Sequence, residues 1–168
     1  IKSRSRLEKG LFATAPGATN WYQWLIEILP TVMLMQNLPK AYDDYPLLVP
    51  EEILSGGVFR ETLDLFIGTR PMIGLARDAK YYVGEMVVIP PPVFGPFNLH
   101  DHEWPVPEDY VNNIGVMQQF RMQTLDRLGV TYDGNGPKCV FLARPPGKRA
   151  YNQEDILEVA RARGFEVM

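Results

Sequence analysis

Short apolar runs alternate with longer amphipathic segments along this chain, and that alternation restricts its fold more than any other feature. Residues 46–50 read Pro-Leu-Leu-Val-Pro, and residues 72–75 read Met-Ile-Gly-Leu. Between them, the helical periodicity of residues 58–67 ends at Gly68. Continuously apolar strands separated by a helix are typical of a parallel sheet covered by helices. We therefore predict an α/β fold, with a further strand over 81–89 that turns at Gly84-Glu85.

A strongly apolar helix is predicted to begin after Asn20, a residue type that favours the N-cap position. Its apolar side chains cover most of its circumference, which is typical of a buried helix. The remaining polar side chains, Gln23, Glu27 and Thr31, recur every four residues and so share one face. Pro30 has no backbone N–H, so we expect it to kink this helix.

A polar turn sequence marks a domain boundary in the second half of the chain. Residues 132–137 read Tyr-Asp-Gly-Asn-Gly-Pro, which is typical of a turn. They follow a long helix that we predict over 107–129. Arg121 falls on the apolar face of this helix, so we expect it to be buried and paired with a structural carboxylate; the alternative is that it reaches into a cleft. We interpret residues 1–131 as one α/β domain of the Rossmann-like kind and residues 132–137 as a hinge.

After the hinge the pattern opens a second Rossmann-like domain. A strand over 138–143 and a basic loop precede a helix capped by Asn152 and ended by Gly164, and another strand then begins. Residues 138–168 thus supply one strand–helix–strand unit, which cannot bury a core alone. We therefore expect the chain to be a truncated piece of a longer protein.

The charge balance argues against one class of partner. The chain carries 17 Lys and Arg against 20 Asp and Glu, a net charge of −3. Non-specific binding of nucleic acid needs a strong positive field, so we expect no nucleic-acid partner. The single cysteine, Cys139, permits no internal disulfide and no zinc-binding cysteine pair.

A basic loop is the first candidate for binding chemistry. Arg144, Lys148 and Arg149 lie between a predicted strand and the start of a predicted helix. Phosphates bind at this position in α/β folds, because free N–H groups and the helix dipole both favour an anion. These cations suit a nucleoside diphosphate. A solvated basic turn is the alternative interpretation.

Glu27 is the candidate catalytic residue. A carboxylate that faces a cleft can serve as a general base for an acceptor hydroxyl, and burial would raise its pKa. A solvated or ion-paired surface glutamate is the alternative. The segment from His100 to Glu103 (His-Asp-His-Glu) holds both histidines of the chain, but such close spacing in a proline-rich loop fixes no ligand geometry. We predict no metal site.

Two segments together resemble glycosyltransferase family 61. The first is Asn20 to Pro30, which reads Asn-Trp-Tyr-Gln-Trp-Leu-Ile-Glu-Ile-Leu-Pro. The second runs from Phe141-Leu-Ala-Arg144 through Lys148-Arg149 and Asn152-Gln-Glu to Gly164-Phe165. Their order and separation match the family over roughly residues 18 to 168, with Leu63 to Gly68 in between.

The resemblance implies a GT-B fold and an inverting transfer of a sugar from a nucleotide-sugar donor to a glycan or protein hydroxyl. It implies donor or acceptor contacts by Asn20, Gln23, Arg144, Lys148 and Arg149. The nucleotide sugar is a co-substrate, and no other cofactor is expected. The donor pocket would need the remainder of the C-terminal domain, so we expect this segment alone to be inactive.

One departure from the family bears on activity. Gln23 stands where the family has a histidine, and glutamine cannot accept a proton. Either Glu27 is the base or the protein is a catalytically degenerate glycan- or nucleotide-binding protein. The resemblance leaves the compartment open, cytoplasmic for a bacterial enzyme and the Golgi or ER lumen for a eukaryotic one.

Overall fold

The computed structural model describes residues 3–95, 106–131, 140–141 and 152–168. The chain divides into two compact units, Ile1–Gly129 and Val130–Met168. The predicted hinge at 132–137 lies outside the described residues. Among the described residues, no helix combines the length and the apolarity needed to cross a bilayer.

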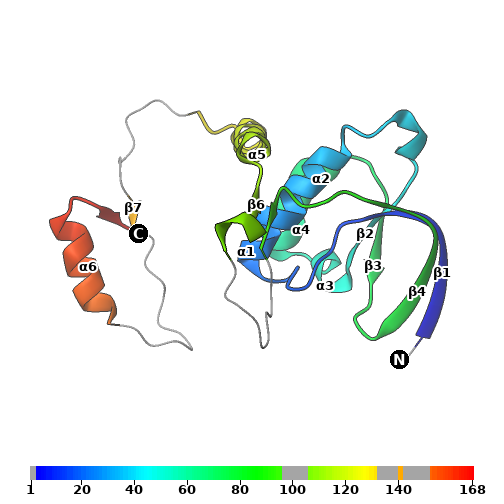
Figure 1. Ribbon diagram of the computed structural model, residues 1–168, viewed down its shortest axis with the longest axis horizontal. Helices are drawn as coiled ribbons and strands as arrows, with labels where there is room; N and C mark the ends of the chain where they lie inside the picture. Colours follow the sequence, from blue (N-terminus) through cyan, green and yellow to red (C-terminus); the bar gives the residue numbers. More distant parts are fainter. Residues whose placement is uncertain (1–2, 96–105, 132–139, 142–151) are drawn as a thin grey trace. The chain divides into compact units, whose positions relative to one another are not determined.

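The first unit is built on a four-stranded sheet in which every neighbouring pair is parallel. This confirms the predicted α/β class and is compatible with a Rossmann-like fold. The strand order is β3-β2-β1-β4 (Figure 1), with β1 at Ser3–Phe12, β2 at Leu47–Pro50, β3 at Met72–Leu75 and β4 at Ala79–Val88.

Helices connect β1 to β2 and β2 to β3, and their side chains supply much of the core. After β1, α1 (Trp21–Gln23), the π-helix η1 (Trp24–Ile28) and α2 (Leu29–Met35) follow one another without a break. The 3-10 helix η2 (Lys40–Tyr42) precedes β2, and α3 (Glu51–Leu54) and α4 (Gly57–Ile67) precede β3. Helices α2 and α4 pack together (Figure 1). The buried side chains of η1, α2 and α4 meet those of the sheet in one apolar core that includes Leu11, Trp24, Leu29, Leu47, Val49 and Phe66.

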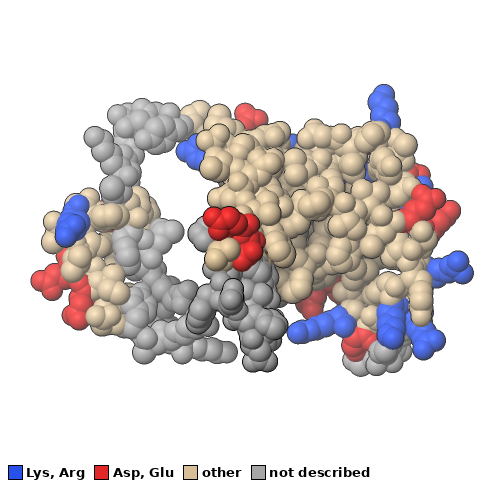
Figure 2. Space-filling model, in the orientation of Figure 1, with Lys and Arg blue, Asp and Glu red and all other residues tan. Residues whose placement is uncertain are grey.

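The first strand was not among the predicted elements. Arg4, Arg6 and Glu8 alternate as exposed residues along β1, while the residues between them are partly buried. This alternation arises because successive side chains of a strand point to opposite faces. Figure 2 shows several Lys and Arg side chains on the side of the first unit where β1 begins.

The predicted turn at Gly84 is wrong, because β4 runs through it without interruption. A Cβ at Gly84 would lie 2.6 Å from the backbone oxygen of Glu8. Glycine is therefore required here for the close approach of two strands, a role that a sequence pattern does not distinguish from a turn.

The long helix starts later than predicted. Residues 107–109 form the 3-10 helix η3 (Pro107–Asp109), and β6 (Val111–Asn112) pairs in antiparallel fashion with β5 (Val93–Phe94). The helix itself, α5, spans Ile114–Arg127, because the Asn113 side chain accepts a hydrogen bond from the Val116 N–H and caps it there. Arg121 is exposed, so the prediction of a buried, paired arginine is also wrong.

The second unit contains the predicted strand–helix–strand order. Strands β7 (Val140–Phe141) and β8 (Glu166–Val167) are parallel and joined through α6 (Gln153–Ala162). Asn152 occupies the N-cap position, but its side chain donates to the Asp155 carboxylate and makes no cap hydrogen bond. Gly164 has a positive φ of 77°, as expected for a residue that ends a helix.

The fit at Gly84 gives a test of the β1–β4 pairing. We expect Gly84→Ala to lower the free energy of unfolding by about 1–3 kcal/mol, because the new Cβ would collide with the Glu8 backbone. Gly115→Ala in α5 is the matched control, since its Cβ would meet only Asn113 Oδ1 at 3.5 Å. Urea unfolding followed by tryptophan fluorescence reports on the first unit. An equal midpoint for the two variants would contradict the pairing.

Candidate functional site

The helical segment after β1 is held at its start by its predicted cap. The Tyr22 N–H donates to Asn20 Oδ1 over 2.9 Å, and the Trp24 N–H donates to the Asn20 carbonyl over 2.9 Å. The indole N–H of Trp24 donates to Thr62 Oγ1 on α4 over 2.8 Å, which fixes the rotation of the segment. Asn20 is exposed, and its side-chain oxygen is used for this cap.

A π-turn lies immediately before Pro30. The Leu29 N–H donates to the Trp24 carbonyl, five residues back instead of four. Proline lacks an N–H, and its ring collides with the carbonyl four residues earlier in an α-helix. The wider turn relieves this collision, so Pro30 is accommodated within a continuous helical segment. Single π-turns of this kind occur frequently at functional sites.

Glu27 sits on this π-turn and is buried, with 4% of its surface exposed. Among the described residues, none donates a hydrogen bond or supplies an ion pair to its carboxyl group. Burial therefore raises the pKa of the Glu27 carboxyl above its ordinary value of 4.5. A carboxylate that is buried without a charged partner is costly and uncommon in a structural role.

The other polar residues of the predicted stripe have different surroundings. Thr31 is also buried, and its hydroxyl donates to the Glu27 backbone carbonyl over 2.6 Å. Gln23 is partly buried, and its Oε1 has no hydrogen-bond partner among the described residues. It lies beside Gly17, where an added Cβ would be 3.6 Å from Gln23 Cδ. Two residues of the stripe, Glu27 and Thr31, line one cavity together.

That cavity is small and mostly apolar. Its volume is about 100 Å³, and Glu27 and Thr31 form part of one wall. The other lining residues come from the end of β1 and the loop after it, from η1, and from β4 and the segment that follows it: Phe12, Ala13, Thr14, Ala15, Ile28, Val88, Ile89 and Pro91. We call it the Glu27 cavity. It can admit a small polar group to a carboxylate in water-poor surroundings.

A larger cleft of about 510 Å³ adjoins this cavity and shares Phe12, Thr14 and Ala15 with it. The cleft is lined by the carboxyl ends of β1, β2 and β3, at Phe12, Pro50 and Leu75. In open α/β sheets, ligands bind outside the carboxyl ends of the strands. We call this hollow the strand-end cleft.

The polar lining of the strand-end cleft was not predicted from the sequence. Its polar side chains include Arg77, Glu52, Thr19 and Tyr81. Arg77 lies between β3 and β4 and is the only cation among the described residues that line the cleft. These residues lie close to predicted strand ends in the sequence. That position could have indicated the cleft only if the order of the strands in the sheet had been known.

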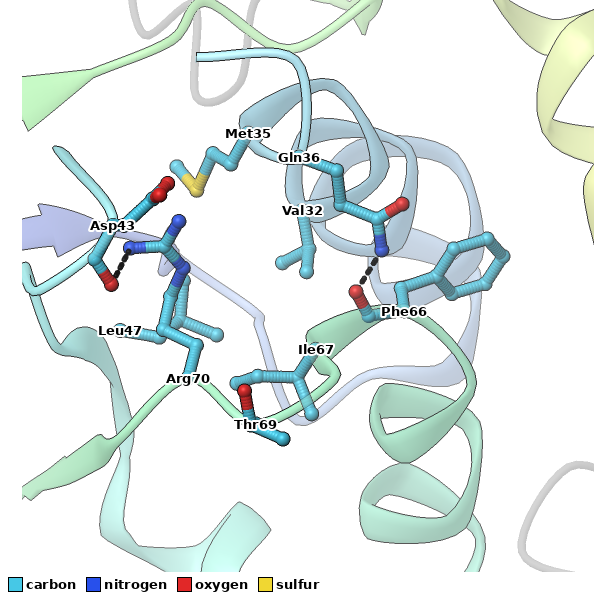
Figure 3. A pocket seen from close by; sticks show the side chains of 9 residues that line it. All are labelled: Val32, Met35, Gln36, Asp43, Leu47, Phe66, Ile67, Thr69 and Arg70. Carbon is cyan, nitrogen blue, oxygen red and sulfur yellow. Dashed lines mark hydrogen bonds between the residues drawn. The ribbon is translucent and has the colours of Figure 1, made fainter. Parts of the chain in front are cut away.

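A third cavity, of about 250 Å³, lies where β2 and β3 begin (Figure 3). Arg70 lines this cavity, and the Arg70 Nη1 donates to the backbone carbonyls of Tyr42, Asp43 and Tyr45 over 2.5, 3.2 and 2.9 Å. On the other side of the cavity, Gln36 Nε2 donates to the Phe66 carbonyl. Arg70 thus holds the loop before β2 against the loop before β3, which is a structural role.

Several predicted residues lie outside the described residues. These are the basic-loop residues Arg144, Lys148 and Arg149 and the segment from His100 to Glu103. Within the described part of the chain, no three His, Cys, Asp or Glu side chains are grouped so as to hold a metal ion.

Comparison with known proteins adds no relative to this picture. The chain matches no protein-family model, no curated protein and no solved structure. The resemblance to glycosyltransferase family 61 therefore rests on the residues quoted above, and its consequences are proposals.

The buried carboxyl predicts a specific pH dependence of stability. Because the pKa of Glu27 is higher in the folded chain than in the unfolded chain, ionisation costs stability. That cost is absent well below pH 4.5 and grows as the pH rises through the folded pKa. We expect Glu27→Gln to unfold at higher urea than wild type at neutral pH, with the difference shrinking toward pH 4.5.

Glu61→Gln is the control, because Glu61 is an exposed carboxylate on α4. Its difference from wild type should be small at every pH. A Glu27→Gln variant that is less stable than wild type at neutral pH would show that the carboxylate has a stabilising partner, contrary to this description.

Proposed function

We propose that this chain is part of a glycosyltransferase of GT-B type, in which Glu27 is the general base. The protein would move a sugar from a nucleotide-sugar donor to a hydroxyl of a glycan or protein acceptor, with inversion. One observation carries the proposal: Glu27 is buried, has no partner among the described residues, and lines a cavity that adjoins the strand-end cleft.

Sugar transfer to a hydroxyl requires a general base that removes the hydroxyl proton. The acceptor hydroxyl gives its proton to the Glu27 carboxylate while its oxygen attacks the anomeric carbon of the donor sugar. The bond from that carbon to the nucleoside diphosphate breaks, and the diphosphate leaves with the electron pair. A base works best when its pKa lies close to the working pH, so a raised pKa favours Glu27 over an ordinary glutamate.

The leaving diphosphate needs positive charge, which the basic loop of Arg144, Lys148 and Arg149 would supply. In the sequence, these residues come after β7 and before α6, and this order favours phosphate binding. Cations in this position replace a metal ion, so we expect donor binding that does not depend on manganese.

A catalytically degenerate glycan- or nucleotide-binding protein is the second candidate function. Gln23 favours it, because glutamine stands where the family has a histidine that could accept a proton. The two functions differ in turnover. Only the glycosyltransferase consumes a nucleotide sugar, whereas the degenerate protein binds a glycan or a nucleotide without turnover.

The base assignment predicts the effect of one substitution in the full-length protein. We expect Glu27→Gln to lower kcat for sugar transfer by about 10²- to 10⁴-fold, because a neutral amide of the same shape cannot accept the proton. The affinity for the donor should stay the same. Glu61→Gln is the matched control and should keep wild-type kcat. A Glu27→Gln variant within about twofold of wild type would rule out Glu27 as the base.

The basic loop predicts a separate loss of donor affinity. We expect Arg144→Ala in the full-length protein to weaken binding of a nucleoside diphosphate by about 10- to 100-fold, since it removes a charge-assisted hydrogen bond. Calorimetry with and without manganese measures this. Unchanged affinity would remove Arg144 from the donor site. The absence of any nucleotide binding by the wild-type protein would reject the glycosyltransferase and favour the degenerate protein in its glycan-binding form.

A further inference from the structure

The size of the Glu27 cavity restricts which hydroxyl can reach the base. We propose that the acceptor hydroxyl belongs to a hydroxymethyl group, either the exocyclic arm of a hexose or the side chain of a serine. This inference rests on the proposed function and names the substrate class of the same site. It follows from the volume, the lining and the neighbours of the cavity.

A sugar ring is too large for the cavity. Its volume is about 100 Å³, whereas cavities that bind a six-membered ring such as benzene measure about 150 Å³. A water molecule takes about 30 Å³ in the liquid, so a carbon and an oxygen fit easily. Secondary hydroxyls are attached directly to the ring and would require part of the ring to enter. A hydroxymethyl group extends its oxygen beyond the ring.

The residues that line the cavity suit a hydroxymethyl group, because they offer apolar contacts for its carbon and a carboxylate for its hydroxyl. The cavity walls are apolar at Ile28, Ile89 and Pro91, which suits the methylene carbon. Thr31 donates its hydroxyl proton to the Glu27 backbone carbonyl, so it does not occupy the carboxylate. Since no residue in the described part of the chain donates to the Glu27 carboxylate, it can accept a hydrogen bond, and then the proton, from the incoming hydroxyl.

The rest of the acceptor has a place outside the cavity. The strand-end cleft, of about 510 Å³, shares Thr14 and Ala15 with the cavity and can hold a sugar ring or a peptide segment. A ring in the cleft with its arm in the cavity brings the hydroxymethyl oxygen to Glu27. Transfer then breaks its O–H bond, forms the bond to the anomeric carbon and releases the nucleoside diphosphate.

Matched acceptors test the inference with the full-length protein. A methyl hexoside and the corresponding methyl pentoside differ only by the hydroxymethyl arm, and a serine peptide and its alanine counterpart differ only by the hydroxyl. With a donor that the protein turns over, we expect a product from the hexoside or the serine peptide and at least about tenfold less from its counterpart. NMR of the product identifies the new linkage.

Each outcome has a defined meaning. A linkage at the hexose arm or at the serine oxygen supports the inference and tells the two sources apart. A linkage at a ring hydroxyl, or equal transfer to hexoside and pentoside, overturns the inference and leaves the glycosyltransferase proposal standing. No transfer to any acceptor, together with no consumption of nucleotide sugar, overturns the proposed function itself.

Enlarging the cavity gives an independent test. Ile89→Ala removes part of the cavity wall, so a ring hydroxyl gains access to Glu27. We expect the ratio of pentoside to hexoside transfer to rise by about tenfold or more. Ile53→Ala is the control, because Ile53 is buried in α3 and does not line the cavity. An unchanged ratio in a folded Ile89→Ala variant would overturn the size argument.

Discussion

Pro30 has no backbone N–H, and the helical segment after β1 must accommodate it without losing its place in the core. The segment does so with a π-turn over Trp24–Ile28, in which the Leu29 N–H bonds to the Trp24 carbonyl. Trp24 is fully buried at the start of this turn and is tied to α4 through Thr62. The Trp24–Thr62 hydrogen bond fixes the start of the π-turn, and the hydrogen bond from Leu29 to Trp24 closes it. Glu27 lies within this turn and is buried.

The sheet supplies the other half of the site. The strands β1, β2 and β3 run in parallel, so their carboxyl ends form one edge, and the strand-end cleft lies along it. The strands β3 and β4 lie at opposite edges of the sheet, because the strand order is β3-β2-β1-β4. Only three residues nevertheless join β3 to β4. The sheet must therefore curl, and this brings Ala79 and Tyr81 at the start of β4 into the cleft beside Leu75.

Much of the fold follows from local patterns, whereas the site depends on topology. The strand β2, the bounds of β3 and the end of α4 could be predicted, because the prolines, apolar residues and glycine that indicate them lie within or next to each element.

Other features could not be predicted from local patterns. The alternating charged residues of β1 concealed that strand. Gly84 was interpreted as a turn, whereas glycine is needed there because the backbone of Glu8, far away in the sequence, lies so close. Glu27 stood out as one polar residue on an apolar helix, but the cavity beside it is lined also by Ile89 and Pro91, which are distant in the sequence. Arg77 could not be assigned to the cleft before the strand order was known.

A direct titration of the Glu27 carboxyl tests the central claim, that this group is buried and has no stabilising partner within the described part of the chain. The measurement is the carboxyl ¹³C chemical shift as a function of pH in protein labelled at glutamate, with Glu27→Gln used to assign the signal. We expect a titration midpoint above the ordinary value of 4.5, because burial disfavours the charged carboxylate. A midpoint at or below that value would mean that the carboxylate is solvated or paired with a cation. This result would contradict the description of Glu27 as a buried, unpaired general base.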